Sequence, residues 1–306
     1  MGGSEAELTL EASAAEVAAP VRRRRHRPRL ATPALLGLPI GWLVVFLLVP
    51  IVIVALYSVD VLALFPGPHS FALGGWYRLF HQGYMSLFWK SAQMSLIVSA
   101  LVVLAAYPLA YFLALSGTRR KYVLLLLLIA PFLTSYLLRV LAWKVILGDN
   151  GVINSALRSL GLHPLSFLLY SRFAVMLVLG YVWLPFVALP IFVTLDTLDR
   201  RLLEAASDLY ASRWKAFLRV TLPLSMPGVV AAFLFVFIPT VGEFVTPSIV
   251  GGSSGYMYGN QIVDFFQQGF PDWETGATLS LFLIAVISVL TFVFVRFLRL
   301  GEARAA

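Results

Sequence analysis

The chain has 306 residues, of which 60% are hydrophobic and only 12% are charged, and its formal net charge is +8. Soluble domains are about 45–50% apolar and about 25% charged, so this composition excludes an ordinary water-soluble fold. The sequence contains no cysteine, which excludes disulfides, thiolate metal sites and cysteine nucleophiles.

The first 33 residues are expected to form a disordered cytoplasmic tail. Residues 1–20 are rich in acidic and small residues, a composition typical of disorder. Six arginines follow between Arg22 and Arg29, directly before a long apolar stretch, which is the pattern of a cytoplasmic flank rather than of a nucleic-acid site. That stretch is too long for the apolar region of a signal peptide, so we expect it to remain as an anchor.

Six apolar stretches predict six transmembrane helices, at about 34–59, 91–117, 122–147, 173–195, 220–250 and 275–297. Each approaches or exceeds the ~17–25 residues that cross the hydrocarbon core as a helix. The stretches are continuously apolar rather than alternating, so a β-barrel is excluded. The predicted fold is an all-α polytopic membrane protein with a transmembrane domain at 34–300. Prolines 108, 131, 185, 190 and 239 are expected to kink helices two to five.

The basic residues predict the orientation of this domain. Most Lys and Arg residues fall on the tail, the second and fourth connections and the C-terminal end. Cytoplasmic flanks retain basic residues, so both termini are expected to be cytoplasmic. Outer-loop aromatic residues such as Trp76 and Tyr77 are expected at the lipid interface.

Motifs for catalysis are weak. No G-x-x-x-x-G-K-[ST] phosphate loop occurs, and no two histidines have the i, i+4 spacing of a helical metal site. Gly251–Gly255 matches the G-x-S-x-G hydrolase pattern, but no histidine follows His163, so the hydrolase order of Ser, acid and His is not completed. We expect no catalytic residue and no metal site, with an intramembrane hydrolase using Ser253 or Ser254 as an alternative.

The connection at 196–222 is long, charged and helically patterned. Leu202, Leu203, Ala206 and Leu209 recur at near-helical spacing, and a second apolar group starts at Trp214. The pattern predicts two short amphipathic helices, with Pro223 separating them from helix five. Glu204 is expected near a helix start, where a carboxylate complements the helix dipole.

The sequence of this connection resembles the EAA loop of ABC importer permeases. The residues that carry the resemblance are Glu204, Ala205, Ala206, Asp208, Leu209, Tyr210, Ala211, Ser212, Trp214 and Phe217, followed by Leu222-Pro223. In that family the loop docks in a groove of a cytoplasmic ATPase. The family's usual glycine is Tyr210 here. Glycine allows a positive φ at low cost and tyrosine does not, which puts the shape of the bend in question.

A wider resemblance, from about Gly41 to Leu300, is to the spermidine/putrescine-type permeases of the PotB-like group. It rests on the segments 107–114, 130–135 with Leu138-Arg139, 151–154, 239–247 with Gly251-Gly252, and 259–262. The resemblance implies a type I ABC importer in a bacterial inner membrane. It also implies a PotC-like sibling permease, a homodimeric cytoplasmic ABC ATPase that binds ATP and Mg, and an extracytoplasmic substrate-binding protein. No cofactor is expected in this chain itself.

Glu243 is the candidate residue for a substrate path, because it is an acidic residue well inside an apolar stretch. Its carboxylate would attract a polyamine cation, and Phe244, Trp183 and Tyr181 would add cation–π contacts. The equally weighted alternative is that Glu243 pairs with Arg139 or Lys144, or that its side chain extends to the outer membrane interface. Polyamine import is therefore the expected function. Another amine, an opine, thiamine or ferric iron as substrate, and a stand-alone ion-coupled transporter, are the alternatives.

Overall fold

The structure is a computed structural model that describes residues 31–61, 71–115, 120–267 and 272–305. It divides into two units, Met1–Pro50 and Ile51–Ala306. The basic cluster and residues 1–30 of the predicted tail lie outside the described residues. Within the described ranges the chain is helical and contains no strand.

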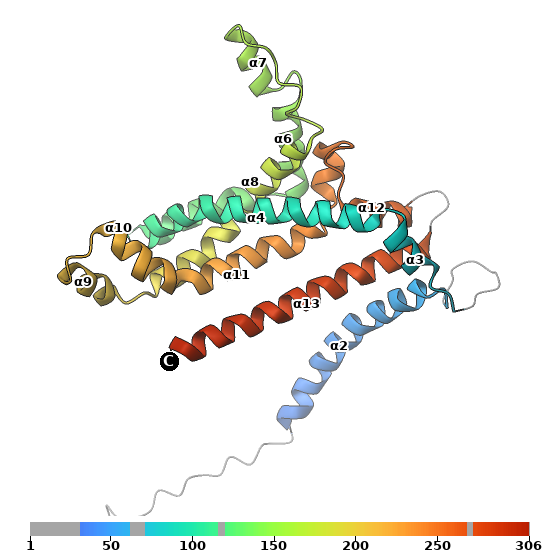
Figure 1. Cartoon of the computed structure of the whole chain (residues 1–306), viewed down its shortest axis with the longest axis horizontal. Coiled ribbons are helices and arrows are strands. Elements are labelled where there is room, and N and C mark those ends of the chain that lie inside the picture. Colours follow the sequence, from blue (N-terminus) through green and yellow to red (C-terminus); the bar gives the residue numbers. More distant parts are fainter. Residues whose placement is uncertain (1–30, 62–70, 116–119, 268–271, 306) are drawn as a thin grey trace, which may run out of the picture. The chain divides into compact units, whose positions relative to one another are not determined.

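The helices follow one another along the chain with short connections (Figure 1). In order they are α2 (Ala31–Ser58), α3 (Gly74–His81), α4 (Tyr84–Leu115), α5 (Lys121–Ile129), η1 (Ala130–Leu133), α6 (Tyr136–Leu147), α7 (Val152–Ser159), α8 (Arg172–Asp196), α9 (Arg200–Asp208), α10 (Arg213–Ala216), η2 (Phe217–Thr221), α11 (Leu222–Val241), η3 (Pro247–Gly251), α12 (Tyr258–Gln267) and α13 (Trp273–Ala305).

Five of the described helical stretches are long and apolar enough to cross a membrane, and the number rises to six if a bent pair of helices forms one span. The five stretches are Pro39–Ser58, Tyr84–Leu115, Arg172–Asp196, Arg213–Val241 and Trp273–Arg296. The predicted all-α membrane fold is confirmed.

Helices α4, α8 and α11 form the core of the second unit. Their contact faces are rich in small residues, and Ala106 and Ala110 of α4 are completely buried. Gly228 of α11 lies so close to α8 that a Cβ atom there would come within 2.9 Å of the Pro190 carbonyl oxygen. Small residues let helix backbones approach closely, which is how helices associate in lipid.

The third predicted helix, 122–147, is not continuous. Its two halves, 121–133 and the stretch that begins at Tyr136, are bent by 83° at residues 134–135. Thr134 has an extended backbone, with φ −75° and ψ 160°, and Ser135 is also non-helical. Pro131 lacks an N–H and disfavours continuation of the helix, so the predicted kink here becomes a break. The other four prolines named above lie inside continuous helices.

The fifth predicted helix, 220–250, has different ends. A continuous helical stretch starts already at Arg213, passes through the π-helical turn η2 and ends at Val241. Pro223 therefore does not separate the loop from helix five. A wider π turn directly before it accommodates the missing N–H and the bulk of the proline ring. Residues 242–244 then break the helix before η3.

The second helix also starts earlier than predicted, at Tyr84 rather than residue 91. Phe88 in this added part is buried and forms edge-to-face ring contacts with Tyr258 and Phe282. Tertiary packing, not apolar composition alone, sets this end of the helix.

Candidate functional site

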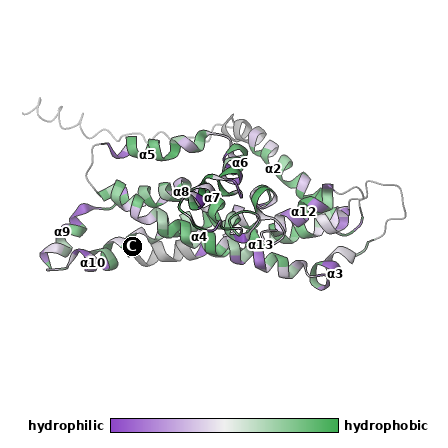
Figure 2. Ribbon diagram, turned by 90° about the horizontal axis from the view of Figure 1, so that it is seen from above, coloured by the Kyte–Doolittle hydropathy of each residue, from purple (hydrophilic) through white to green (hydrophobic). Residues whose placement is uncertain are grey.

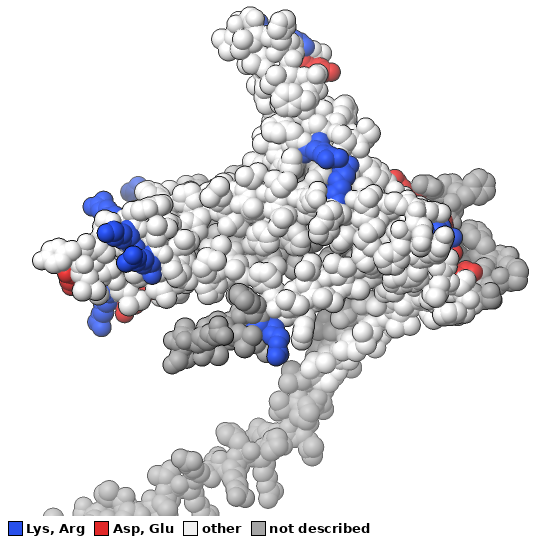
Figure 3. All heavy atoms as spheres, in the orientation of Figure 1, with Lys and Arg blue, Asp and Glu red and all other residues white. Residues whose placement is uncertain are grey.

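The EAA-like loop forms one exposed end of the second unit. Figure 3 shows Lys and Arg gathered over α9 and α10, with acidic side chains near the tip, and Figure 2 shows hydrophilic residues in both helices. Glu204, Ala205, Asp208 and Ser212 are exposed, whereas Ala206 and Ala211 are half-buried. The predicted loop is therefore free to contact a partner and does not fold back into the bundle.

Two polar side chains fix the starts of its helices. Asp199 accepts a hydrogen bond from the Arg201 backbone N–H at 3.0 Å and caps α9. Ser212 accepts one from the Lys215 N–H at 3.4 Å and caps α10. Glu204 is the fifth residue of α9, so the expectation that it lies at the helix start is wrong. Asp199 holds that position because its short side chain reaches the free N–H groups.

Tyr210 closes the bend between α9 and α10. Its backbone has a φ of +56°, in the left-handed region that glycine normally occupies. The Tyr210 N–H donates to the Ser207 carbonyl at 2.9 Å, and the Ala211 N–H donates to the Ala206 carbonyl at 3.0 Å. This pair of bonds is a Schellman motif. The bend thus keeps the shape that glycine would give it, although a tyrosine occupies the position.

Phe217 connects the loop to the core. Its ring makes edge-to-face contacts with Tyr107 and Tyr111 of α4, at 5.8 and 5.7 Å, and stacks on Trp214 at 5.4 Å. Since α10 also runs on into α11, a force applied at α9 and α10 would reach α4 and α11 through packed side chains and a continuous helix. The loop is thus physically connected to both α4 and α11.

A salt bridge lies at the base of the loop. The Lys121 ammonium, at the start of α5, donates to Asp196, the last residue of α8. The Tyr122 hydroxyl donates to the same carboxylate at 3.3 Å. These contacts fasten the end of α8 just before α9 begins.

Glu243 lies in the break between α11 and η3. Its Oε1 atom accepts hydrogen bonds from the backbone N–H groups of Val245, at 2.9 Å, and Thr246, at 3.2 Å. The side chain thereby satisfies backbone groups that the interrupted helix leaves free. In this role the carboxylate caps the helical segment that follows the break.

Arg139 and Lys144, the two predicted alternatives for pairing with Glu243, have other surroundings. The Arg139 guanidinium lies 5.0 Å from the centre of the Phe132 ring, and the Lys144 ammonium lies 5.9 Å from that of Tyr170. Within the described residues, salt bridges join Arg78 to Asp272 and Glu274, and Lys121 to Asp196, and none joins Glu243 to either cation. The predicted pairing of Glu243 is absent from this part of the chain.

The aromatic candidates lie in α8 and the α11 break. Tyr181 contacts the rings of Phe132 and Trp143, and Trp183 contacts those of Phe186 and Phe235. Phe244 is 42% exposed. No ring contact joins Phe244 to the two α8 residues in the described ranges, so the four path candidates do not form one cluster in this conformation.

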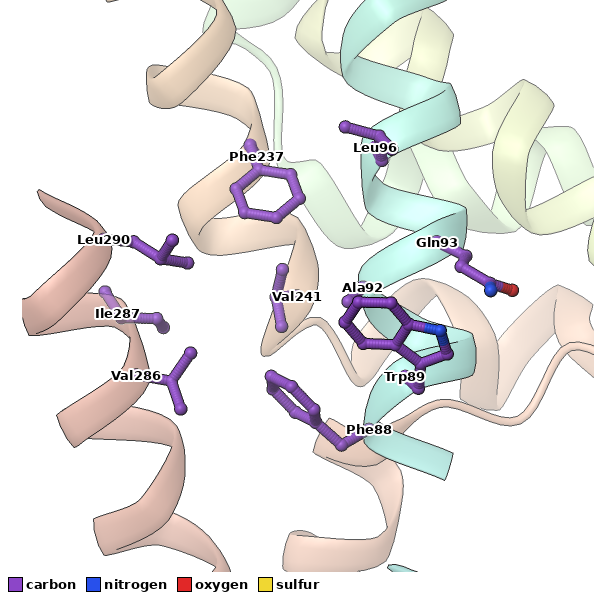
Figure 4. Close-up of a pocket in the computed structure, with 10 residues that line it drawn as sticks. All are labelled: Phe88, Trp89, Ala92, Gln93, Leu96, Phe237, Val241, Val286, Ile287 and Leu290. Carbon is purple, nitrogen blue, oxygen red and sulfur yellow. The ribbon is translucent and has the colours of Figure 1, made fainter. Parts of the chain in front are cut away.

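Two hollows lie among the helices. One, of about 450 Å³, lies between α4, α6 and α8 and is lined by Tyr181 and Trp143 among other residues. The other, of about 280 Å³, separates α4 and α11 from α13, with Phe88, Val241 and Val286 facing one another across it (Figure 4). Neither is lined by a charged residue, and Glu243 borders neither one.

The G-x-S-x-G segment lies between η3 and α12, not on a strand-to-helix elbow. The Ser254 hydroxyl donates to the Tyr170 carbonyl at 3.5 Å. In the same region the Tyr256 hydroxyl donates to Asp264, and burial together with that carboxylate raises the pKa of Tyr256 above its ordinary value. This environment keeps the phenol neutral.

Residues 106–306 match the family described as "Binding-protein-dependent transport system inner membrane component". The chain belongs to this family. It is 33% identical over 261 residues to the spermidine/putrescine transport system permease protein PotB of Haemophilus influenzae, a match that covers 84% of this chain and 90% of that protein. It is 34% identical over 267 residues to PotB of Escherichia coli, with 85% and 95% covered. The chain is thus a PotB-like permease subunit of an ABC importer and a multi-pass inner-membrane protein.

Solved structures support the same fold for this permease. A bacterial alginate ABC transporter, crystallised with an alginate pentasaccharide-bound periplasmic protein, matches with a TM-score of 0.64 at 18% identity. The match covers 90% of this chain and 94% of that one. At this identity the likeness concerns the fold alone.

Several important residues were not singled out from the sequence. Asp199, which caps α9, precedes a helical pattern and was recognisable as a capping residue. Ser212 was named only as part of the EAA-like motif, and its role as the cap of α10 was recognisable in the same way. Asp196 and Lys121 are 75 residues apart, and no sequence pattern predicts their pairing. Gly259 and Asn260 belong to a segment of family resemblance, but the sequence does not reveal that they contact the break after α11.

Proposed function

We propose that this permease subunit imports polyamines such as spermidine and putrescine, using the ATP hydrolysis of a separate cytoplasmic ATPase. The PotB relatives are named for spermidine/putrescine transport. The observation that carries the ATPase part is the exposed α9–α10 loop, which is packed onto α4 through Phe217 and is continuous with α11. In this proposal 196–222 is the coupling loop, and both termini lie on its side of the membrane.

The full assembly contains two permease subunits, two ATPase copies and a binding protein outside the cell. The binding protein delivers the substrate, and the permease pair supplies the path through the 34–300 domain. Each conformation of the ATPase dimer favours one conformation of the helices, so nucleotide binding and hydrolysis shift the helices between two states. Glu243, Phe244, Trp183 and Tyr181 contribute to the path when the helices rearrange.

Reconstitution in liposomes tests this function. The permease pair, the ATPase and the binding protein are reconstituted together, and uptake of labelled spermidine is measured with and without ATP. Uptake is expected only with ATP and with all components present. Uptake driven by a proton or sodium gradient through this chain alone would contradict the proposal, as would competition for uptake by thiamine, an opine or ferric iron but not by putrescine.

A charge reversal tests the coupling loop. Glu204 is exposed on α9, so Glu204→Arg should leave the permease folded and in the membrane but abolish substrate-stimulated ATP hydrolysis. Asp149→Arg is the matched control, because Asp149 is also exposed but lies after α6, far along the chain from the loop. Equal loss of ATP hydrolysis in both variants would show that the effect is not specific to the loop.

A further inference from the structure

Large apolar side chains gather at the tip of the α9–α10 loop. Leu209, Tyr210 and Trp214, which we call the loop tip, are 82%, 97% and 66% exposed. Such residues at a lipid-facing surface need no explanation, but this segment is not apolar enough to lie in lipid. Helix α9 contains Arg200, Arg201, Glu204 and Asp208 among its nine residues, and charged groups are excluded from the hydrocarbon core.

Tyr210 is the residue at the loop tip whose presence costs free energy. A left-handed φ of +56° is unfavourable for a residue with a Cβ atom and favourable for glycine. The two Schellman hydrogen bonds use only the backbone, so they do not depend on the tyrosine ring. Glycine would form the same bend without strain, which means that the shape of the bend does not account for the aromatic side chain.

The charges around the loop tip indicate the surface that would receive it. Glu204 and Asp208 are four residues apart on α9 and are both exposed, so they lie on one side of that helix. Arg213 and Lys215 are exposed at the start of α10, beyond the tip. Arg200 and Arg201 are exposed at the start of α9 as well, so a complementary partner has an apolar pocket with basic groups facing Glu204 and Asp208 and acidic groups facing the cations at the starts of α9 and α10.

We propose that the Tyr210 ring is an anchor that enters an apolar pocket in the docking groove of the ATPase. This inference rests on the proposed function, which supplies the partner. Exposed aromatic residues that become buried at a protein interface contribute much of its affinity, and Tyr is enriched among such residues. The tyrosine thus adds a contact at the position where the resembled family has a glycine that only shapes the bend.

Three substitutions separate the contribution of the ring to ATPase binding from that of the backbone conformation. Tyr210→Phe keeps the ring, Tyr210→Ala removes the ring and keeps the strain, and Tyr210→Gly removes both. The dissociation constant of the purified ATPase for the permease pair is measured for each variant, both in detergent and in nanodiscs that contain anionic lipid. Tyr77→Ala is the matched control, since Tyr77 is 64% exposed on α3. A thermal unfolding measurement on each variant monitors folding.

The ring is expected to decide the affinity. Tyr210→Phe should bind within about twofold of the wild type, whereas Tyr210→Ala and Tyr210→Gly should bind roughly tenfold more weakly or worse. Tyr210→Gly is the decisive variant, because it loses the ring while its bend becomes more favourable. If Tyr210→Gly binds as tightly as the wild type, the ring is no anchor.

Two other outcomes have distinct meanings. A loss of affinity in nanodiscs but not in detergent would place the ring on the bilayer surface and overturn the inference. Absence of ATPase binding by the wild-type permease pair would instead contradict the proposed function itself, before any variant is compared.

Discussion

The side-chain amide of Asn260, in α12, donates a hydrogen bond to the backbone carbonyl of Phe244, in the α11 break, at 2.9 Å. The same nitrogen donates to the Ser248 hydroxyl at 2.6 Å, and the Asn260 Oδ1 atom accepts from the Met257 N–H. Next to it, Gly259 lies against the break so closely that a Cβ atom would come within 2.7 Å of the Glu243 carbonyl oxygen. These contacts from α12 thus stabilise the backbone conformation of the break.

Replacement of Asn260 should loosen the break. Asn260→Ala leaves the buried Met257 N–H without this acceptor, whereas the Phe244 carbonyl keeps the N–H and the hydroxyl of Ser248 as donors. An unsatisfied buried polar group costs about 1–3 kcal/mol, so we expect a clearly lower unfolding temperature in detergent and reduced uptake. Gln267→Ala, at the exposed end of the same helix, serves as the control and should behave like the wild type. An unchanged unfolding temperature for Asn260→Ala would show that the bond does not stabilise the break.

Because α8 and α11 pack closely at Gly228, we expect Gly228 to tolerate a larger side chain less well than Gly180 does. At Gly228 a Cβ atom would come within 2.7 Å of the Thr194 Cβ and within 2.9 Å of the Pro190 carbonyl oxygen. Gly228→Ala should therefore push the helices apart and cost about 1–3 kcal/mol of stability, as overpacking does. At Gly180 the nearest atom is Val102 Cγ2, at an ordinary 3.6 Å, so Gly180→Ala should be neutral or slightly stabilising. Thermal unfolding of both variants checks this contrast, and equal effects would contradict it.

Arg78 should fasten α3 to the start of α13. Its guanidinium donates to Thr275 Oγ1 at 2.7 Å and to Glu274 Oε2 at 2.6 Å, while Glu274 Oε1 accepts from the Gly75 backbone N–H at 2.6 Å. The two side chains are 29% and 20% exposed, so solvent weakens the pair, and Arg78→Ala should cost about 1 kcal/mol. Faster hydrogen exchange of the α3 amides in this variant would be the direct readout. Glu274→Gln keeps an acceptor for Gly75 and should loosen α3 less.

The membrane helices were predictable from the length of the apolar stretches, whereas the bends within the helices and the contacts between them were not. The helix predicted at 173–195 is found at Arg172–Asp196, because a charged residue stands at each end of a continuous apolar run. The break at residues 134–135 was not predicted, since Pro131 signals a kink but composition does not tell a kink from a break. The same holds for the break at residues 242–244, where the Glu243 carboxylate accepts from the following N–H groups of Val245 and Thr246 and Asn260 of α12 donates to the Phe244 carbonyl.

In the EAA-like loop the motif predicted the exposed helices, whereas their caps and the bend at Tyr210 became visible only in the structure. The EAA-like residues predicted an exposed, helical loop, and they correctly raised the question of Tyr210. The φ of +56° shows that backbone hydrogen bonds and the neighbouring helices outweigh the preference of tyrosine. Propensity is a weak guide where tertiary context fixes the backbone.

The observed capping role of Glu243 and its proposed role in the substrate path can be separated by a pair of substitutions. Glu243→Gln retains a side-chain oxygen for the N–H groups of Val245 and Thr246 but removes the negative charge. Glu243→Ala removes both. If the carboxylate attracts the polyamine, Glu243→Gln should fold like the wild type and yet raise the KM for spermidine uptake about tenfold, because a desolvated carboxylate contributes strongly to cation binding. Glu243→Ala should lose stability as well as uptake. If Glu243→Gln transports spermidine with an unchanged KM and only Glu243→Ala is impaired, the side chain is a helix cap and has no part in the substrate path.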